Sequence, residues 1–218
     1  MKQLFIAVAL LLFVIKGVAQ KGQGYNSAVA AVFDKLNNKS FATLDMEDTS
    51  GTLFNTTSLS GKTIYVDFWF TACAPCIKEI PYARSLQEYF VEDTNVVFLN
   101  ICIESTERKK VWKQMIRDKE MKGIQLFYER NRPQKINLLR EYNIMFPTYL
   151  LVNKEFKIIG YDAPRPSEEI WIQWAITQAA EGKLLSAAYK KMMSRSKDYQ
   201  EFVNKNPEKI SYLNKAAD

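Results

Sequence analysis

Cys73 and Cys76 are separated by two residues in the stretch VDFWFTACAPCIKEIP, and Cys102 is the third cysteine of the 218-residue chain. A disulfide between residues so close in sequence constrains the unfolded chain only weakly, so it would be a poor structural staple. A zinc site needs four ligands, and the chain has no histidine and only Cys102 to add to the pair. The spacing therefore favours a redox-active pair over a structural bridge or a metal site.

The pair stands where a strand pattern gives way to a helix pattern. Thr63 to Phe70 is rich in β-branched and aromatic residues, and apolar residues recur at helical spacing from Ala74 to about Val91. Unpaired N–H groups and the positive end of the macrodipole at a helix start favour thiolate over thiol. We therefore predict that Cys73, nearer the exposed end, attacks, and that Cys76 is shielded until it resolves the mixed disulfide.

Two prolines and an alanine shape this helix. Pro75 suits the first turn because its missing N–H would have no helical partner there. Pro81 lies deeper and is predicted to kink the helix. Ala74 and Pro75 place no charge between the two sulfurs, and no histidine stabilises a thiolate strongly, as a potent oxidant would require. The segment therefore favours a reductase.

The elements that must position the pair alternate between strand and helix. A hairpin is predicted in FATLDMEDTSGTLFNTT, and strands over Thr63 to Phe70, Asn95 to Ile103, Ile124 to Tyr128 and twice within PTYLLVNKEFKIIGY. Further helices are predicted over Tyr25 to Asn37, Thr106 to Lys119, Pro133 to Tyr142 and Ser167 to Gly182. This alternation indicates an α/β fold, with a mixed central sheet flanked by helices on both faces. In the last hairpin, Phe156 stands where glycine is frequent, and Asn153 is expected to tolerate a left-handed position.

The first residues, MKQLFIAVALLLFVIKGVAQ, have the pattern of a signal peptide over 1–19. Lys2 precedes an apolar run from Leu4 to Ile15, and the small residues Gly17 and Ala19 predict cleavage after Ala19. The run is shorter than the roughly 20 residues that span a bilayer. We therefore expect an extracytoplasmic, periplasmic protein with no stable membrane span after cleavage.

Composition narrows the class of partner. The chain is 47% hydrophobic and 25% charged, as expected for one ordinary globular domain with additions. Its 30 basic and 24 acidic residues are interspersed, and no basic run is interleaved with aromatic residues. We expect no nucleic-acid partner, no metal and no cofactor.

Three stretches carry a resemblance to a known family. VDFWFTACAPCIKEIP resembles the active-site segment of thioredoxins, and FPTYLLVNKEFKIIG resembles their cis-proline strand and hairpin. TLDMEDTSGTLFNTTSLSGKTIYVDFWFTACAPCIKEIP resembles the exported TlpA/ResA-like thiol-disulfide oxidoreductases, which carry a hairpin ahead of the core, an insertion within it and a glutamate three residues past the second cysteine. The resemblance implies a thioredoxin fold over 41–183. Apolar residues at helical spacing predict a helical segment at 20–40 before it and a helical extension at 184–218 after it.

Carried over residue by residue, the resemblance implies a role for each side chain around the pair. Cys73 is the nucleophile and Cys76 the resolving thiol. Asp67 matches the buried acid that takes up or relays the proton of the second cysteine, and burial should raise its pKa. Glu79 matches the active-site glutamate, and its effect would be to hold the resolving thiol protonated.

The resemblance also implies a surface that binds substrate. Pro147 matches the cis-proline that faces the cysteine pair, and the backbone of Phe146 would pair with an incoming strand. Ala74 and Pro75 complete this surface. The partners implied are disulfide-containing exported proteins, among them apocytochromes with their haem-site cysteines, and a membrane thiol that donates electrons.

Two other classes of protein stay open. A peroxiredoxin would carry threonine three residues before its reactive cysteine, where this chain has Phe70. A non-catalytic thioredoxin-like binding module is an alternative because such folds also serve as scaffolds. It would be expected to lose a cysteine or the cis-proline. Cys102 lies in the apolar strand VVFLNICIE and is interpreted as a small buried hydrophobe.

Overall fold

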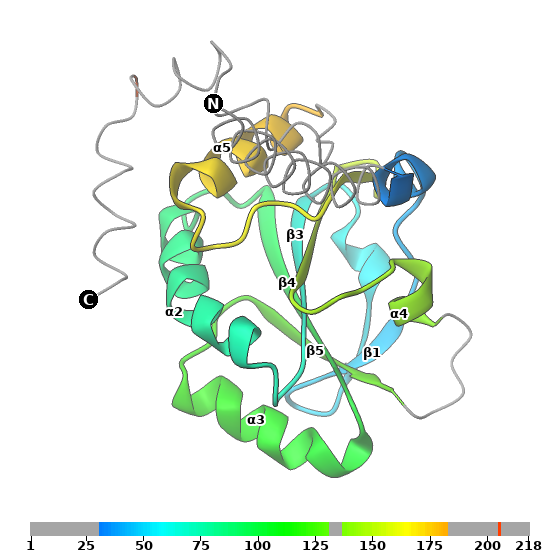
Figure 1. The fold of residues 1–218 in the computed structure, drawn as a ribbon, viewed down its shortest axis with the longest axis vertical. Helices are drawn as coiled ribbons and strands as arrows, with labels where there is room; N and C mark the ends of the chain where they lie inside the picture. The colour runs from blue at the N-terminus through cyan, green and yellow to red at the C-terminus, as the bar shows by residue number, and fades with distance from the viewer. Residues whose placement is uncertain (1–30, 131–136, 183–204, 206–218) are drawn as a thin grey trace, which may run out of the picture.

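The computed structural model describes residues 31–130, 137–182 and Lys205 (Figure 1). A helical turn at 31–36 precedes the sheet. The elements that follow are β1 (Asp45–Asp48), β2 (Leu53–Asn55), the 3-10 helix η1 (Thr56–Leu59), β3 (Thr63–Trp69), α2 (Ala74–Tyr89), β4 (Val96–Glu104), the 3-10 helix η2 (Thr106–Arg108), α3 (Lys109–Asp118), β5 (Ile124–Glu129), α4 (Leu138–Glu141), β6 (Thr148–Val152), β7 (Ile158–Tyr161) and α5 (Glu169–Ala180). Within these ranges, no helix is both long and apolar enough to cross a bilayer.

Several predicted segments fall outside the described residues. They are the signal peptide at 1–19, the start of the helix at Tyr25 and, apart from Lys205, the extension at 184–218. The start of the helix predicted from Pro133 also lies outside the described residues. Within them, Asn137 is extended and α4 begins at Leu138. The Asn137 side chain accepts a hydrogen bond from the Arg140 N–H, so it caps the helix.

Seven strands form one sheet in the order β2-β1-β5-β4-β3-β6-β7. The central strands β3, β4 and β5 are parallel, and β6, β7 and β1 join antiparallel. The predicted hairpin is confirmed, since β1 pairs with β2. In the register of the central pair, Trp69 lies opposite Cys102, so β3 and β4 end at the same edge of the sheet. The turn that carries the cysteines starts from this edge.

The two faces of the sheet bury different clusters, because side chains alternate along each strand. Ile64, Val66 and Phe68 of β3 pack on one face with the helical residues 31–36 and with α4. Tyr65 and Trp69 pack on the other face with residues of α2, α3 and α5. The prediction of a mixed sheet covered on both faces is confirmed. The alternation also places Asp67 on the α2 face.

The turn between β6 and β7 differs from the expectation. Phe156, and not Asn153, takes the left-handed conformation, with φ of 58°. Asn153 braces the turn instead: its carbonyl accepts from Phe156 N at 2.9 Å and its Oδ1 from Lys157 N at 2.9 Å. A left-handed residue other than glycine costs about 1–2 kcal/mol. Burial of the Phe156 ring edge-on to Phe41, with centroids 5.5 Å apart, offsets that cost.

Gly123, between α3 and β5, supplies a test of how tightly this fold is packed. Its φ is 76°, and an added Cβ would lie 2.7 Å from the backbone oxygen of Phe98. Gly61 also has a positive φ, 87°, but nothing lies within 4 Å of its Cβ position. We expect Gly123→Ala to lower the free energy of unfolding by about 2–4 kcal/mol, from conformational strain together with a forced shift of the neighbouring strand.

The matched control is Gly61→Ala, which introduces conformational strain alone and should lose only about 1–2 kcal/mol. Urea unfolding of both variants measures the difference. Equal losses would show that the contact with Phe98 relaxes without cost.

Candidate redox site

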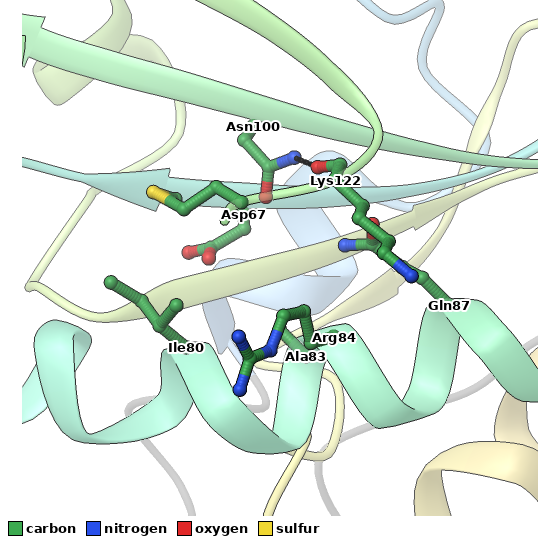
Figure 2. Close-up of a pocket in the computed structure, with 8 residues that line it drawn as sticks. Asp67, Ile80, Ala83, Arg84, Gln87, Asn100 and Lys122 are labelled. Carbon is green, nitrogen blue, oxygen red and sulfur yellow. Dashed lines mark hydrogen bonds between the residues drawn. The ribbon is translucent and has the colours of Figure 1, made fainter. Parts of the chain in front are cut away.

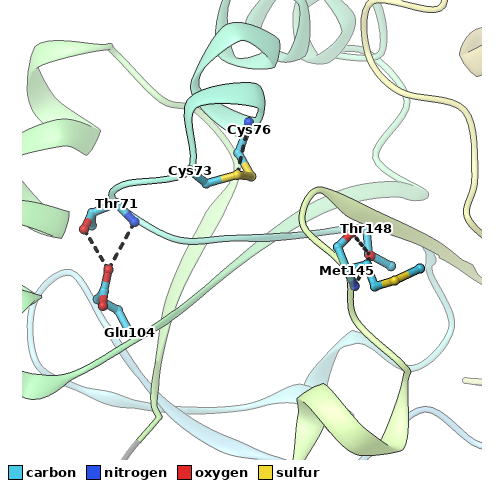
Figure 3. Close-up of a disulfide and its surroundings, with 6 residues drawn as sticks. All are labelled: Thr71, Cys73, Cys76, Glu104, Met145 and Thr148. Atoms are coloured by element: carbon cyan, nitrogen blue, oxygen red, sulfur yellow. Dashed lines mark hydrogen bonds between the residues drawn. A yellow bond between two sulfur atoms is a disulfide. The ribbon is translucent and has the colours of Figure 1, made fainter.

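Cys73 and Cys76 are joined by a disulfide at the start of α2, where the sequence placed them (Figure 3). Cys73 is the N-cap residue, and its Sγ accepts a hydrogen bond from the Cys76 N–H at 3.2 Å. Pro75 lies in the first turn as predicted, and the helix continues through Pro81. The sulfur that begins the helix thus contacts one of its unpaired N–H groups, which favours the thiolate over the thiol.

The predicted difference in exposure between the two sulfurs is wrong for the disulfide form. Cys73 and Cys76 are each 3% exposed. Both pack in a cluster with Trp69, Cys102 and Trp112, and Phe70 and Phe146 lie against it. The side chains around the pair therefore shield both sulfurs alike, while Ala72, Ala74 and Pro75 stay exposed around them.

Asp67 lies behind the pair on β3, opposite Asn100 of β4 and Tyr149 of β6. Figure 2 shows its carboxylate directed from the sheet toward α2, beside Ile80. Its Oδ1 is buried, and none of the described residues offers it a hydrogen bond. Burial, and to a smaller extent the charge of Glu79, raises the pKa of Asp67 to about 8. A carboxyl in this state can take up a proton near neutral pH.

The Asp67 carboxylate opens onto a small cavity under α2 (Figure 2). The cavity leaves about 10 Å³ for the centre of a water molecule, which is room for about one water. It is lined by Asp67, Ile80, Ala83, Arg84, Gln87, Asn100, Met121 and Lys122. Polar and cationic side chains, among them Arg84, Gln87 and Lys122, therefore stand around a space from which a single water can reach this acid.

Glu79 lies one helical turn after Cys76 and is 7% exposed. Its carboxylate accepts two hydrogen bonds from Ser167, one from the backbone N at 2.9 Å and one from Oγ at 2.8 Å. Sequence reasoning singled out Glu79 but not Ser167, which is 88 positions away. No sequence pattern around Glu79 or around Ser167 predicts this contact.

The Phe146–Pro147 peptide bond is cis. Thr148 Oγ1 holds the bend before it, accepting from Met145 N at 3.0 Å and donating to Met145 O at 2.9 Å (Figure 3). The Phe146 ring packs edge-on to Phe70, with centroids 4.9 Å apart. Met145 is 62% exposed, so an apolar side chain stands in solvent at this side of the site.

A second polar group near Cys73 escaped the sequence reasoning. Thr71 donates to Glu104 Oε2 from Oγ1 at 2.8 Å and from its backbone N at 3.3 Å (Figure 3). Arg108 donates to Thr71 Oγ1 from Nε and Nη2, at 2.9 and 2.7 Å. Because β3 and β4 are parallel neighbours, the end of β4 at Glu104 had to lie beside the cysteine turn. The predicted adjacency of these two strands was the feature of the sequence that could have indicated this contact.

Cys102 is buried and unpaired in β4. Burial raises the pKa of its thiol well above the ordinary range. This agrees with the interpretation of Cys102 as a small buried hydrophobe. The part of the chain that the structure describes brings no three acidic or cysteine side chains together in a way that could hold a metal ion.

The family model described as Redoxin matches residues 34–170. The chain belongs to the Redoxin family. This redoxin is 31% identical over 102 residues to the thiol-disulfide oxidoreductase ResA of Bacillus subtilis, a match that covers 46% of the chain and 55% of the relative. It is 24% identical over 116 residues to ResA of Halalkalibacterium halodurans, covering 52% and 61%. The redoxin thus spans between half and two thirds of the length of these relatives.

Solved structures confirm the thioredoxin fold of this redoxin. The thioredoxin domain of a thiol-disulfide oxidoreductase from Bacteroides vulgatus is similar with a TM-score of 0.56 at 23% identity, over 66% of this chain and 97% of that domain. A thiol:disulfide interchange protein from a Bacteroides species has a TM-score of 0.54 at 25% identity, over 67% and 93%. The resemblance to ResA-type oxidoreductases found in the sequence is likewise confirmed.

Proposed function

We propose that this redoxin is an exported thiol-disulfide oxidoreductase that reduces disulfides in other proteins. The observation that carries the proposal is the Cys73–Cys76 disulfide at the N-cap of α2, where the Cys73 sulfur accepts the Cys76 N–H. A sulfur in that position is stabilised as a thiolate, which is the attacking species in disulfide exchange. The family and the named function of its relatives support the same class of reaction.

In the proposed reaction the reduced enzyme starts as a dithiol. The Cys73 thiolate attacks a substrate disulfide, forming a mixed disulfide and releasing one substrate thiolate. Cys76 then loses its proton and attacks the Cys73 sulfur, which releases the second substrate thiolate. Two electrons pass from the enzyme to the substrate, the two substrate thiolates take up protons, and the enzyme is left with the Cys73–Cys76 disulfide.

Asp67 and Glu79 have separate roles in this proposal. Asp67 accepts the proton of Cys76 during resolution, and its raised pKa suits a base that works near neutral pH. The water-sized cavity beside Asp67 gives solvent a path to this carboxyl. Glu79 is a fixed negative charge one turn from Cys76, which disfavours a second negative charge on that thiol before the mixed disulfide forms.

We place substrate binding on the exposed surface around the disulfide. Ala74, Pro75 and Met145 offer apolar contact area there, and the backbone at Phe146 and Pro147 is suited to pair with an extended strand. The proposed substrates are cysteine pairs of exported proteins, among them those of apocytochromes. The signal-peptide pattern predicted at 1–19 supports export. A membrane thiol that restores the dithiol would complete the cycle.

The reduction potential of the Cys73–Cys76 pair tests the proposal. Equilibration of the protein with thiol/disulfide buffers should give a value near that of thioredoxin, about −270 mV. A value near −120 mV would make the protein an oxidant that forms disulfides. A pair that never cycles between dithiol and disulfide would favour the non-catalytic binding module.

A further inference from the structure

We propose that Ser167 is a positioning residue for disulfide exchange: it fixes the Glu79 carboxylate beside Asp67, through hydrogen bonds from its backbone and its side chain. The proposal rests on the function proposed above, because it assigns Glu79 a supporting partner within that site. Ser167 lies just before α5, a segment distant in sequence from the cysteines. It would therefore connect the α5 end of the domain to the chemistry at the start of α2.

The geometry of the contact carries the inference. Glu79 is 7% exposed, so its oxygens have little access to solvent. Ser167 N lies 2.9 Å from Oε2 and Ser167 Oγ lies 2.8 Å from Oε1, so each oxygen has its own donor. Two donors on one residue fix the position and the orientation of the carboxylate together. A buried carboxylate without such donors would favour its neutral form.

Ser167 also brings Glu79 to the start of a helix. Glu168 is the N-cap of α5, so the Ser167 N–H and the first turn of this helix lie at its positive end. The positive end of the helix adds an attraction for the Glu79 carboxylate to the two hydrogen bonds. The carboxylate is therefore held in place by groups that all belong to one short segment.

Titratable groups from three elements face Glu79. Its charge acts on Asp67 and Tyr65 of β3 and on Tyr149 of β6, and Arg165 and Glu168 from the segment before α5 act on Tyr149 as well. Tyr65 Oη donates to Pro164 O at 2.7 Å, which ties β3 to the same segment. The Tyr149 hydroxyl is buried and has no partner among the described residues. Asp67 is the group in this set whose protonation matters for the exchange reaction.

The expected effect follows from these charges. The Glu79 anion raises the pKa of Asp67. Loss of the Ser167 hydroxyl removes one of the two donors, so the Glu79 carboxylate is freer to move away from Asp67. A greater separation weakens its effect, and the pKa of Asp67 should fall toward that of an ordinary carboxyl.

The experiment is a carbon-13 NMR titration of the Asp67 carboxyl in the oxidised full-length protein, with the resonance assigned by its loss in Asp67→Asn. We expect Glu79→Gln to lower the Asp67 midpoint by about 1 pH unit and Ser167→Ala by about half as much. Ser167→Thr keeps both donors and should restore the wild-type midpoint. Ser58→Ala, which removes an exposed hydroxyl bonded to the Asn55 carbonyl, is the matched control.

A double variant distinguishes positioning from a general loss of structure. If Ser167 acts through Glu79, then Glu79→Gln with Ser167→Ala should titrate like Glu79→Gln alone. An unchanged midpoint in Ser167→Ala, or additive shifts in the double variant, would overturn the proposal. Neither result depends on turnover. A protein that keeps these midpoints but fails to reduce disulfides would overturn the proposed function and leave the positioning role intact.

Discussion

Cys73→Ser is expected to lose protein-disulfide reduction by a factor on the order of 10³ or more. A serine hydroxyl at the N-cap of α2 still accepts the Cys76 N–H, so the helix start should survive. It cannot form a mixed disulfide, and it is far less acidic than a thiol. Turnover with a disulfide-bonded protein substrate and a thiol reductant measures the loss. Cys102→Ala removes a buried thiol outside the Cys73–Cys76 disulfide, and we expect it to keep wild-type turnover.

The companion variant, Cys76→Ser, should fail at a different step. Its Cys73 thiolate keeps the backbone N–H of residue 76 and can still attack, but nothing resolves the product. We expect a stable adduct between the variant and its substrate, visible by mass and cleaved by dithiothreitol. Adducts that accumulate on Cys73→Ser in place of Cys76→Ser would reverse the assignment of the two sulfurs.

Asp67→Asn is expected to change both the stability of the protein and the rate at which it resolves the mixed disulfide. Burial raises the pKa of Asp67 from 3.8 to about 8, so between these values the folded protein holds a proton that the unfolded chain has released. The free energy of unfolding therefore falls as the pH rises across this window, by about 1.4 kcal/mol per pH unit from this group. The neutral amide removes that slope, so the variant should become the more stable protein toward pH 8.

Urea midpoints at pH 5, 6.5 and 8 test the stability change, with exposed Asp34→Asn as the matched control. Parallel curves for Asp67→Asn and wild type would contradict the raised pKa. The same variant should resolve the mixed disulfide about 10²-fold more slowly, because it lacks the proposed general base. In the wild type, the rate of this resolution step should increase as the pH approaches 8, and this increase should be absent in Asp67→Asn.

Sequence patterns predicted the parts of this site that lie close together along the chain. The spacing of Cys73 and Cys76 and the change from strand to helix at Ala74 located the disulfide, because capping and macrodipole effects are local. Asp67 and Pro147 needed the resemblance to known thioredoxins, since a single carboxyl or X–Pro pair carries no signal of its own. Most strand limits were correct to within one or two residues, because β-branched and aromatic runs mark buried strands.

The contacts that the sequence did not reveal join segments far apart in the chain. Ser167 meets Glu79 across 88 positions, and Thr71 meets Glu104 across 33. No sequence spacing around Ser167 or Thr71 predicts which residue it contacts. The left-handed Phe156 was missed for a different reason: local propensity favours glycine or asparagine there, and the tertiary contact with Phe41 overrides it.

The alternation of side chains along β3 has a consequence for engineering this protein. Ile64, Val66 and Phe68 face a cluster of apolar and aromatic residues, whereas Asp67 and both cysteines lie on the opposite side of the sheet. Melting temperature can therefore be raised on a surface that holds neither Asp67 nor the cysteines. Repacking this side should yield heat-resistant versions whose electron chemistry is unaltered, whereas substitutions at Asp67 should change stability and electron chemistry together.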